Sequence, residues 1–111
     1  MVPWLERLSC ETGLRYAKVS IRGQRSRWGS YSSRGTISLN YKLLFLPSTL
    51  VRVVLLHELC HIREMRHSHA FWASLSALAP DLKSSRAELR SAWRYLPRWV
   101  QEDGKKPSSA G

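Results

Sequence analysis

The sequence predicts an α+β fold in which a small antiparallel sheet packs on one buried helix, with further helices toward the C-terminus. Residues 15–22 and 35–41 each alternate apolar and polar side chains, as half-buried strands do. From Pro47 to Ile62, apolar residues leave almost no polar face, which is typical of a helix buried on all sides. With 111 residues, of which 43% are hydrophobic, a single core uses most of the chain.

The N-terminal half carries clear boundary signals. Pro3 suits the first position of a short helix and Gly13 suits its end. The first strand ends before Gly23. Residues 25–35 are rich in Ser, Gly and Arg, so we expect a loop or an irregular strand before the second regular strand.

Two more helices are expected after the buried one, which Pro47 begins. Ser68 can cap a helix that runs until Pro80. Ser85 and Glu88 form a capping-box pattern for a last helix, which Pro97 ends.

The ends of the chain differ in composition. Residues 104–111 hold no large apolar residue, so we expect one domain over residues 1–103 and a disordered tail over 104–111. No apolar run approaches the ~20 residues of a membrane span. Cys10 and Cys60 lie far apart without CxxC spacing, which excludes a disulfide scaffold and a Cys-rich zinc ribbon. A cytoplasmic protein that contacts no membrane is the expectation.

The chain is strongly basic, with 18 Lys and Arg against 8 Asp and Glu and a formal charge of +10. No acid occurs between Thr12 and His57, and Arg86, Arg90 and Arg94 recur at helical spacing. Such a field attracts polyanions, so nucleic acid is a candidate partner. A basic surface can equally serve solubility alone.

An HExxH motif, His57-Glu58-Leu59-Cys60-His61, interrupts the apolar helix. Residues four apart lie on one helix face, so His57 and His61 can present both imidazoles to one metal ion. Glu58 is offset by about 100° and can reach a metal-bound water instead. The alternative, two hydrogen-bonded core histidines and a surface carboxylate, is disfavoured because three ionisable residues in five are costly to bury.

A hydrolytic zinc site needs a third protein ligand and an open position. His67 is preferred because it follows His61 by six residues, the spacing of the metzincin signature, although that signature has Gly where this chain has Glu64. The rival ligands are Glu64 itself, His69, and the later acids Asp81 and Glu88. Cys60 faces away from the metal on helical geometry and is expected in the core.

Four segments together resemble the YgjP-like metallopeptidase-type proteins, often described as predicted metal-dependent hydrolases. They are RSRWGS at 25–30, GTISLN at 35–40, HELCHIREM at 57–65 and HSHAFW at 67–72. The resemblance covers about residues 15–96 and implies a minimal zincin fold related to the SprT-like and WLM metallopeptidases.

The same resemblance implies that His57, His61 and His67 are zinc ligands and that Glu58 is the catalytic carboxylate. Two positions depart from the family pattern: Tyr31 stands where many members have Cys, and Arg66 where many have Asn.

The expected activity is zinc-dependent hydrolysis of peptide bonds in a peptide or protein substrate. A water of lowered pKa attacks the carbonyl, and Glu58 takes its proton and passes it to the leaving amine. Residues 28–33 could pair with an extended substrate as a sheet edge, although Trp28 is also a candidate core residue. A second electrophile remains open among four side chains: Tyr31, Tyr41, Tyr95 and Arg27.

Three alternatives stay open. The chain could be a basic nucleic-acid-associated module with a structural zinc, or a protease that acts on DNA-bound proteins, as the SprT-like and WLM resemblance implies. It could also hydrolyse a non-peptide amide or ester. Three histidines also suit several first-row metals besides zinc. The sequence does not predict the oligomeric state.

Overall fold

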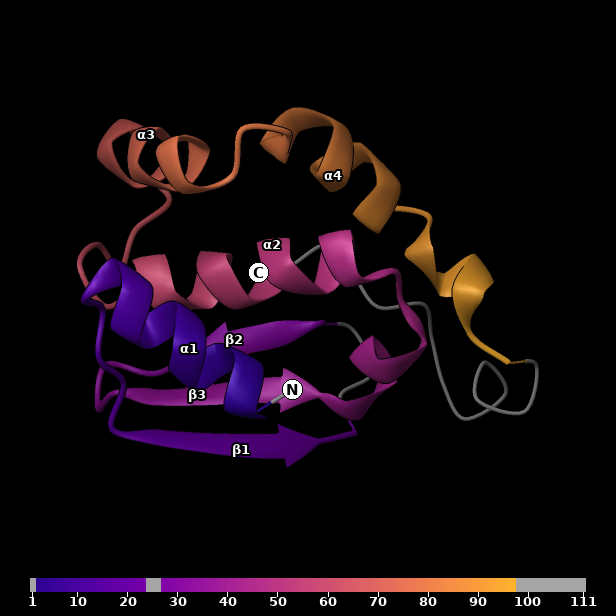
Figure 1. Cartoon of the computed structure of the whole chain (residues 1–111), viewed down its shortest axis with the longest axis horizontal. Helices are drawn as coiled ribbons and strands as arrows, with labels where there is room; N and C mark the ends of the chain where they lie inside the picture. The colour runs from indigo at the N-terminus through magenta and orange to yellow at the C-terminus, as the bar shows by residue number, and fades with distance from the viewer. Residues whose placement is uncertain (1, 24–26, 98–111) are drawn as a thin grey trace.

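The computed structural model describes residues 2–23 and 27–97 (Figure 1). Within them the regular elements, in chain order, are α1 (Val2–Thr12), β1 (Lys18–Arg22), β2 (Gly29–Tyr31), β3 (Thr36–Asn40), the 3-10 segment η1 (Tyr41–Phe45), α2 (Ser48–Cys60), α3 (His69–Leu78), α4 (Leu82–Leu89) and the 3-10 segment η2 (Ala92–Tyr95). The predicted α+β class is confirmed.

The three strands form a mixed sheet in the order β1-β3-β2. β1 runs parallel to β3, with Val19 opposite Ile37, and β2 runs antiparallel to β3, with Ser30 opposite Ser38. The expected antiparallel sheet was therefore wrong for the β1–β3 pair. Alternation of apolar residues assigns the two faces of a strand and carries no information on its direction.

Helix α2 lies in the middle of the molecule. Figure 1 shows the sheet on one side of it and α3 and α4 on the other, with α1 alongside. Every residue from Val53 to Cys60 is buried, and Val54, Leu55, Leu56 and Leu59 have no exposed surface. Contacts on all sides explain why this helix has almost no polar face.

Local signals placed most helix ends correctly. Gly13 follows α1 with φ +74°, a backbone conformation that glycine adopts at little cost. The Ser68 hydroxyl accepts a hydrogen bond from the Phe71 N–H at 3.3 Å and so caps α3 as predicted. Pro47 precedes the first residue of α2, one position from its expected place.

The last helix begins earlier in the structure than the sequence predicted. Helix α4 starts at Leu82, and Ser85 is a buried residue inside it whose N–H donates to the Asp81 carbonyl. The predicted Ser85–Glu88 capping box is thus wrong, since burial of Leu82 draws the helix start forward by one turn. Because α4 ends at Leu89, Arg86, Arg90 and Arg94 do not share one continuous helix.

The Ser- and Gly-rich segment contains the short strand β2, as the irregular-strand interpretation expected. Trp28, just before it, is fully buried and belongs to the core. The expected domain limit at residue 103 and the tail at 104–111 lie outside the described residues. In the described part of the chain, the helices are too short or too polar to cross a bilayer.

Candidate metal centre

Three histidines meet at the end of α2. His57 lies in its last turn, His61 is the residue that directly follows the helix, and His67 comes from the loop that leads into α3. One ligand atom from each residue lies within 4.8 Å of the others. The ring centroids of His57 and His61 are 5.0 Å apart, and those of His61 and His67 are 4.8 Å apart. The structure thus brings together the three residues that the sequence analysis singled out.

The rival ligands do not join this group. Over residues 2–23 and 27–97, the cluster with metal-ligating geometry contains histidines alone. Glu64 contributes its backbone carbonyl, which bonds His61, while His69 begins α3 and Asp81 precedes α4. The chain turns at Glu64 with ordinary backbone angles, because no non-glycine residue in the described ranges has a positive φ.

Hydrogen bonds orient two of the imidazoles. The Nδ1–H of His61 donates to the Glu64 carbonyl at 3.2 Å, which leaves Nε2 with a free lone pair. That Nε2 lies 3.1 Å from Nε2 of His67. In His57, Nδ1 lies 3.3 Å from the Oε2 acceptor of Glu58, so we assign the proton to Nδ1.

A metal ion fits this arrangement. Nε2 of His57 is buried and has no hydrogen-bond partner within the described residues. Buried polar atoms are normally satisfied, and a cation bound by the lone pairs of the three imidazoles would satisfy this one.

The electrostatics favour neutral histidines. Burial lowers the pKa of His57 to about 4, and the positive charge of Arg86 contributes. Burial also lowers the pKa of His61 and of His67. All three are therefore neutral at pH 7, which is the form that binds a metal ion.

Glu58 lies beside the cluster and has no exposed surface. Burial raises its pKa to about 8, although the charges of His61 and Arg27 act in the opposite direction. Its Oε1 atom is buried without a hydrogen-bond partner among the described residues. A carboxyl group held this way is costly to the fold.

Comparison with known proteins agrees with this site. The family model described as "YgjP-like, metallopeptidase domain" matches residues 1–92. The chain belongs to the YgjP-like metallopeptidase family. It is also similar to the crystal structure of the metallopeptidase zymogen of Pyrococcus abyssi abylysin, with 26% sequence identity and a TM-score of 0.73 over 85% of this chain and 96% of that one. A search of curated proteins found no match.

In this YgjP-like domain, two of the four candidate electrophiles interact with residues of the site, one with His61 and one with Glu58. The Tyr31 ring stacks on His61, with centroids 6.3 Å apart and an interplanar angle of 13°. The positive charge of Arg27 acts on Glu58 and lowers the pKa of its carboxyl group, against the larger effect of burial, which raises it. Tyr41 instead lies against Gly23 near the end of β1, and Tyr95 lies under the Arg94 guanidinium.

Sequence reasoning assigned no role to Asn40, which is fully buried. Its side-chain amide donates to the Arg27 carbonyl at 2.8 Å, and its Oδ1 accepts from the Lys42 N–H at 3.0 Å. Its backbone N–H donates to the Trp28 carbonyl at 2.9 Å. Asn40 therefore anchors the chain that leads into β2. Its signal was its place at the end of GTISLN, one of the segments that carry the family resemblance.

Aromatic residues of α3 form one wall of the centre. The Phe71 ring stacks on His61 at 4.6 Å, and the Trp72 ring lies 5.4 Å from His67. On Trp72 rests the guanidinium of Arg86 from α4, at 4.2 Å from the ring centroid. This stack was not predicted, because it depends on how the two helices pack.

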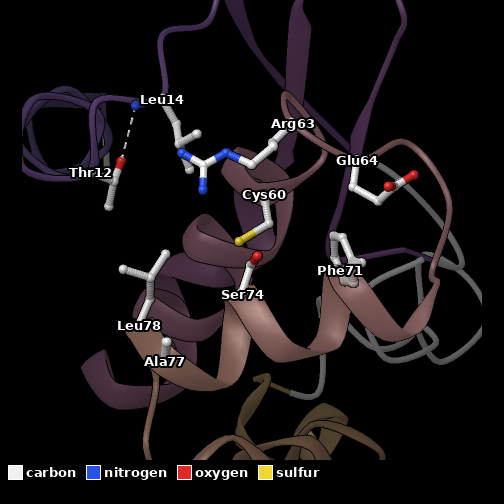
Figure 2. Close-up of a pocket in the computed structure, with 9 residues that line it drawn as sticks. All are labelled: Thr12, Leu14, Cys60, Arg63, Glu64, Phe71, Ser74, Ala77 and Leu78. Atoms are coloured by element: carbon white, nitrogen blue, oxygen red, sulfur yellow. Dashed lines mark hydrogen bonds between the residues drawn. The ribbon is translucent and has the colours of Figure 1, made fainter.

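A pocket of about 230 Å³ lies behind the centre, between the end of α1, the end of α2 and α3 (Figure 2). It shares Phe71 and Glu64 with the histidine site and contains none of the three histidines. Cys60 lines it and points toward Ser74 in Figure 2. Cys60 is buried, and burial raises the pKa of its thiol to about 11, so its predicted place in the core is confirmed.

Proposed function

We propose that the chain is a zinc-dependent peptidase with Glu58 as its general base. The observation that carries the proposal is the convergence of three neutral histidines beside a buried carboxyl group with an unpaired oxygen. His57, His61 and His67 would hold the ion. Three protein ligands and an open fourth position are typical of catalytic rather than structural zinc. A nitrogen-only set suits zinc, as it also suits several other first-row ions.

Bound zinc would polarise the substrate carbonyl and lower the pKa of a water toward neutrality. Glu58 accepts the proton at Oε1, the oxygen without a partner, and delivers it to the leaving amine. A pKa raised to about 8 makes this carboxylate a stronger base than an exposed glutamate. The positive charge of an ion bound by the three neutral histidines would favour the ionised form of Glu58.

The edge of the sheet supports peptide as the substrate. β2 is one of the two edge strands in the order β1-β3-β2, and it is the edge strand that lies beside α2. An outer strand offers backbone N–H and C=O groups to an extended peptide, which can add to the sheet as a further strand. Tyr31, at the end of β2, and Arg27, just before it, are the candidates to stabilise the oxyanion.

The test compares Glu58→Gln with Glu64→Gln, a matched control whose carboxylate lies outside the ligand cluster. Both proteins are loaded with zinc and incubated with a mixture of proteome-derived peptides, and the new termini are counted by mass spectrometry. We expect Glu58→Gln to keep zinc and lose turnover by about 10²-fold or more, the usual contribution of a general base. A fully active Glu58→Gln protein would refute the mechanism.

Association with nucleic acid is a second proposal, and the charge of +10 favours it. It is compatible with a peptidase that acts on DNA-bound proteins. Binding of a DNA duplex that weakens steeply with salt, with zinc bound, would support it. For the cellular location we propose the cytoplasm, where free thiols such as Cys10 and Cys60 stay reduced.

A further inference from the structure

A second groove, of about 510 Å³, opens between α3 and α4. Its basic wall is formed by Lys83 and Arg86 of α4 and by Arg90, which directly follows that helix, and Trp72 of α3 faces them. Trp72 also lies 5.4 Å from the His67 ring and 5.9 Å from the His57 ring. The groove and the histidine cluster therefore share one indole.

Arg86 is placed to bind an anion. Its guanidinium lies 4.2 Å from the Trp72 ring centroid, and the side chain is half-buried. Stacking on a ring face leaves the N–H donors at the rim of the guanidinium free. In the described part of the chain, no carboxylate forms an ion pair with Arg86, Lys83 or Arg90. These three cations face the groove without a counter-ion from those residues.

We propose that this groove binds an acidic side chain of the peptide substrate close to the scissile bond. The inference rests on the proposed peptidase function and names its substrate class. A carboxylate matches the guanidinium fork with two parallel hydrogen bonds, and the indole shields that pair from water. An extended peptide advances about 3.3 Å per residue, and one indole separates Arg86 from the histidines, so the acidic residue lies within about three positions of the cleaved bond.

A strand of nucleic acid fits the groove less well. The row of arginines that favoured a polyanion is broken, because α4 ends at Leu89. Arg94 is turned to its neighbours and donates to the Ser91 hydroxyl at 2.9 Å and to the Tyr95 hydroxyl at 3.3 Å. The remaining cations line one bounded groove, which suits a single carboxylate rather than a series of phosphates.

The test measures equilibrium binding, so it does not depend on turnover. Zinc-loaded Glu58→Gln protein is titrated with fluorescein-labelled octapeptides of alanine and serine that carry glutamate at each position in turn. The matched peptides carry glutamine at the same positions. We expect glutamate at one or two positions to bind about tenfold more tightly than glutamine, as a charge-assisted hydrogen bond allows.

Variants identify the groove. Adding Arg86→Gln should abolish the preference for glutamate, and Arg86→Lys should retain part of it because the charge remains without the fork. If Arg86→Gln fails to fold, Lys83→Gln serves in its place: Lys83 is exposed, and its substitution should weaken the preference for glutamate. The matched control is Arg22→Gln, which removes the same charge from β1 at the opposite edge of the sheet from β2 and should leave the preference unchanged.

Three outcomes overturn the proposal: equal binding of the two peptide series, a preference that survives both Arg86→Gln and Lys83→Gln, or a single-stranded oligonucleotide that binds more tightly than the acidic peptides with the same dependence on Arg86. Failure of the peptidase proposal is distinguishable. In that case the glutamate preference persists, while the native chain with zinc cleaves no peptide.

Discussion

Gly29 on β2 lies directly against the side chain of Glu58 on α2. A Cβ atom at position 29 would lie 3.2 Å from both Cγ and Oε2 of Glu58 and 3.3 Å from the Ser38 carbonyl oxygen. Gly29 does not have a positive φ, so the close approach, not the backbone conformation, is what requires glycine. The strand next to the metal centre thus leaves the space in which the buried carboxyl group sits.

Gly29→Ala should therefore move Glu58 while leaving the histidines in place. We expect zinc to stay bound, kcat to fall by about 10²-fold, and stability to drop by about 1–3 kcal/mol from overpacking. Peptide hydrolysis, zinc content and urea unfolding measure the three effects. Gly23→Ala is the control, because Gly23 is exposed and a Cβ there would meet only the Tyr41 ring. An unchanged kcat in Gly29→Ala would show that Glu58 needs no fixed position.

The metal-free protein should lose stability as the pH rises toward 8. Burial raises the pKa of Glu58 from 4.5 to about 8, so between these values the unfolded chain releases a proton that the folded chain keeps. His57 has the opposite sign: its pKa falls from 6.5 to about 4, and its contribution to stability is lost as the pH falls below 6.5. Above pH 6.5, of these two groups only Glu58 still makes the free energy of unfolding fall as the pH rises.

Urea unfolding with a chelator at pH 6.5 and pH 8 measures this slope. Glu58→Gln removes the titrating group and should unfold at nearly the same urea concentration at both pH values. If the variant loses as much stability as the native chain over this interval, burial of Glu58 is not the cause.

Ser68 links the ligand loop to α3. Its hydroxyl accepts from the Phe71 N–H, and it directly follows His67. Ser68→Ala should cost about 1 kcal/mol of stability, as loss of an N-cap usually does. It should also weaken zinc binding, because the loop that carries His67 loses its anchor. Ser84→Ala removes an exposed hydroxyl within α4 and should do neither. Equal urea midpoints for the two variants would contradict a capping role for Ser68.

Short-range periodicity predicted much of this molecule. The spacing of His57 and His61 required one helix face, and the apolar residues around them required burial, so both the helix and the cluster could be found before the structure. His67 followed from its distance to His61 together with the family resemblance. These relationships act over one or two helical turns, where residue spacing determines which side chains meet.

What the sequence did not predict depends on packing between distant segments. β1 pairs in parallel with β3 because β3, not β2, takes the central position of the sheet, which no alternating pattern encodes. Gly29 resembled an ordinary loop glycine until Glu58 was found against it. Likewise, Arg86 was interpreted as part of a helical row, and its stack on Trp72 exists only because α3 and α4 lie on the same side of α2.

The proposed chemistry depends most directly on the metal ion, so elemental analysis of the purified protein after dialysis against zinc is the decisive measurement. We predict one zinc per chain in the native sequence and in His69→Ala, whose imidazole lies outside the cluster, and little or none in His57→Ala and His67→Ala. Absence of zinc from the native chain, or zinc retained by His67→Ala at the native level, would contradict the three-histidine site.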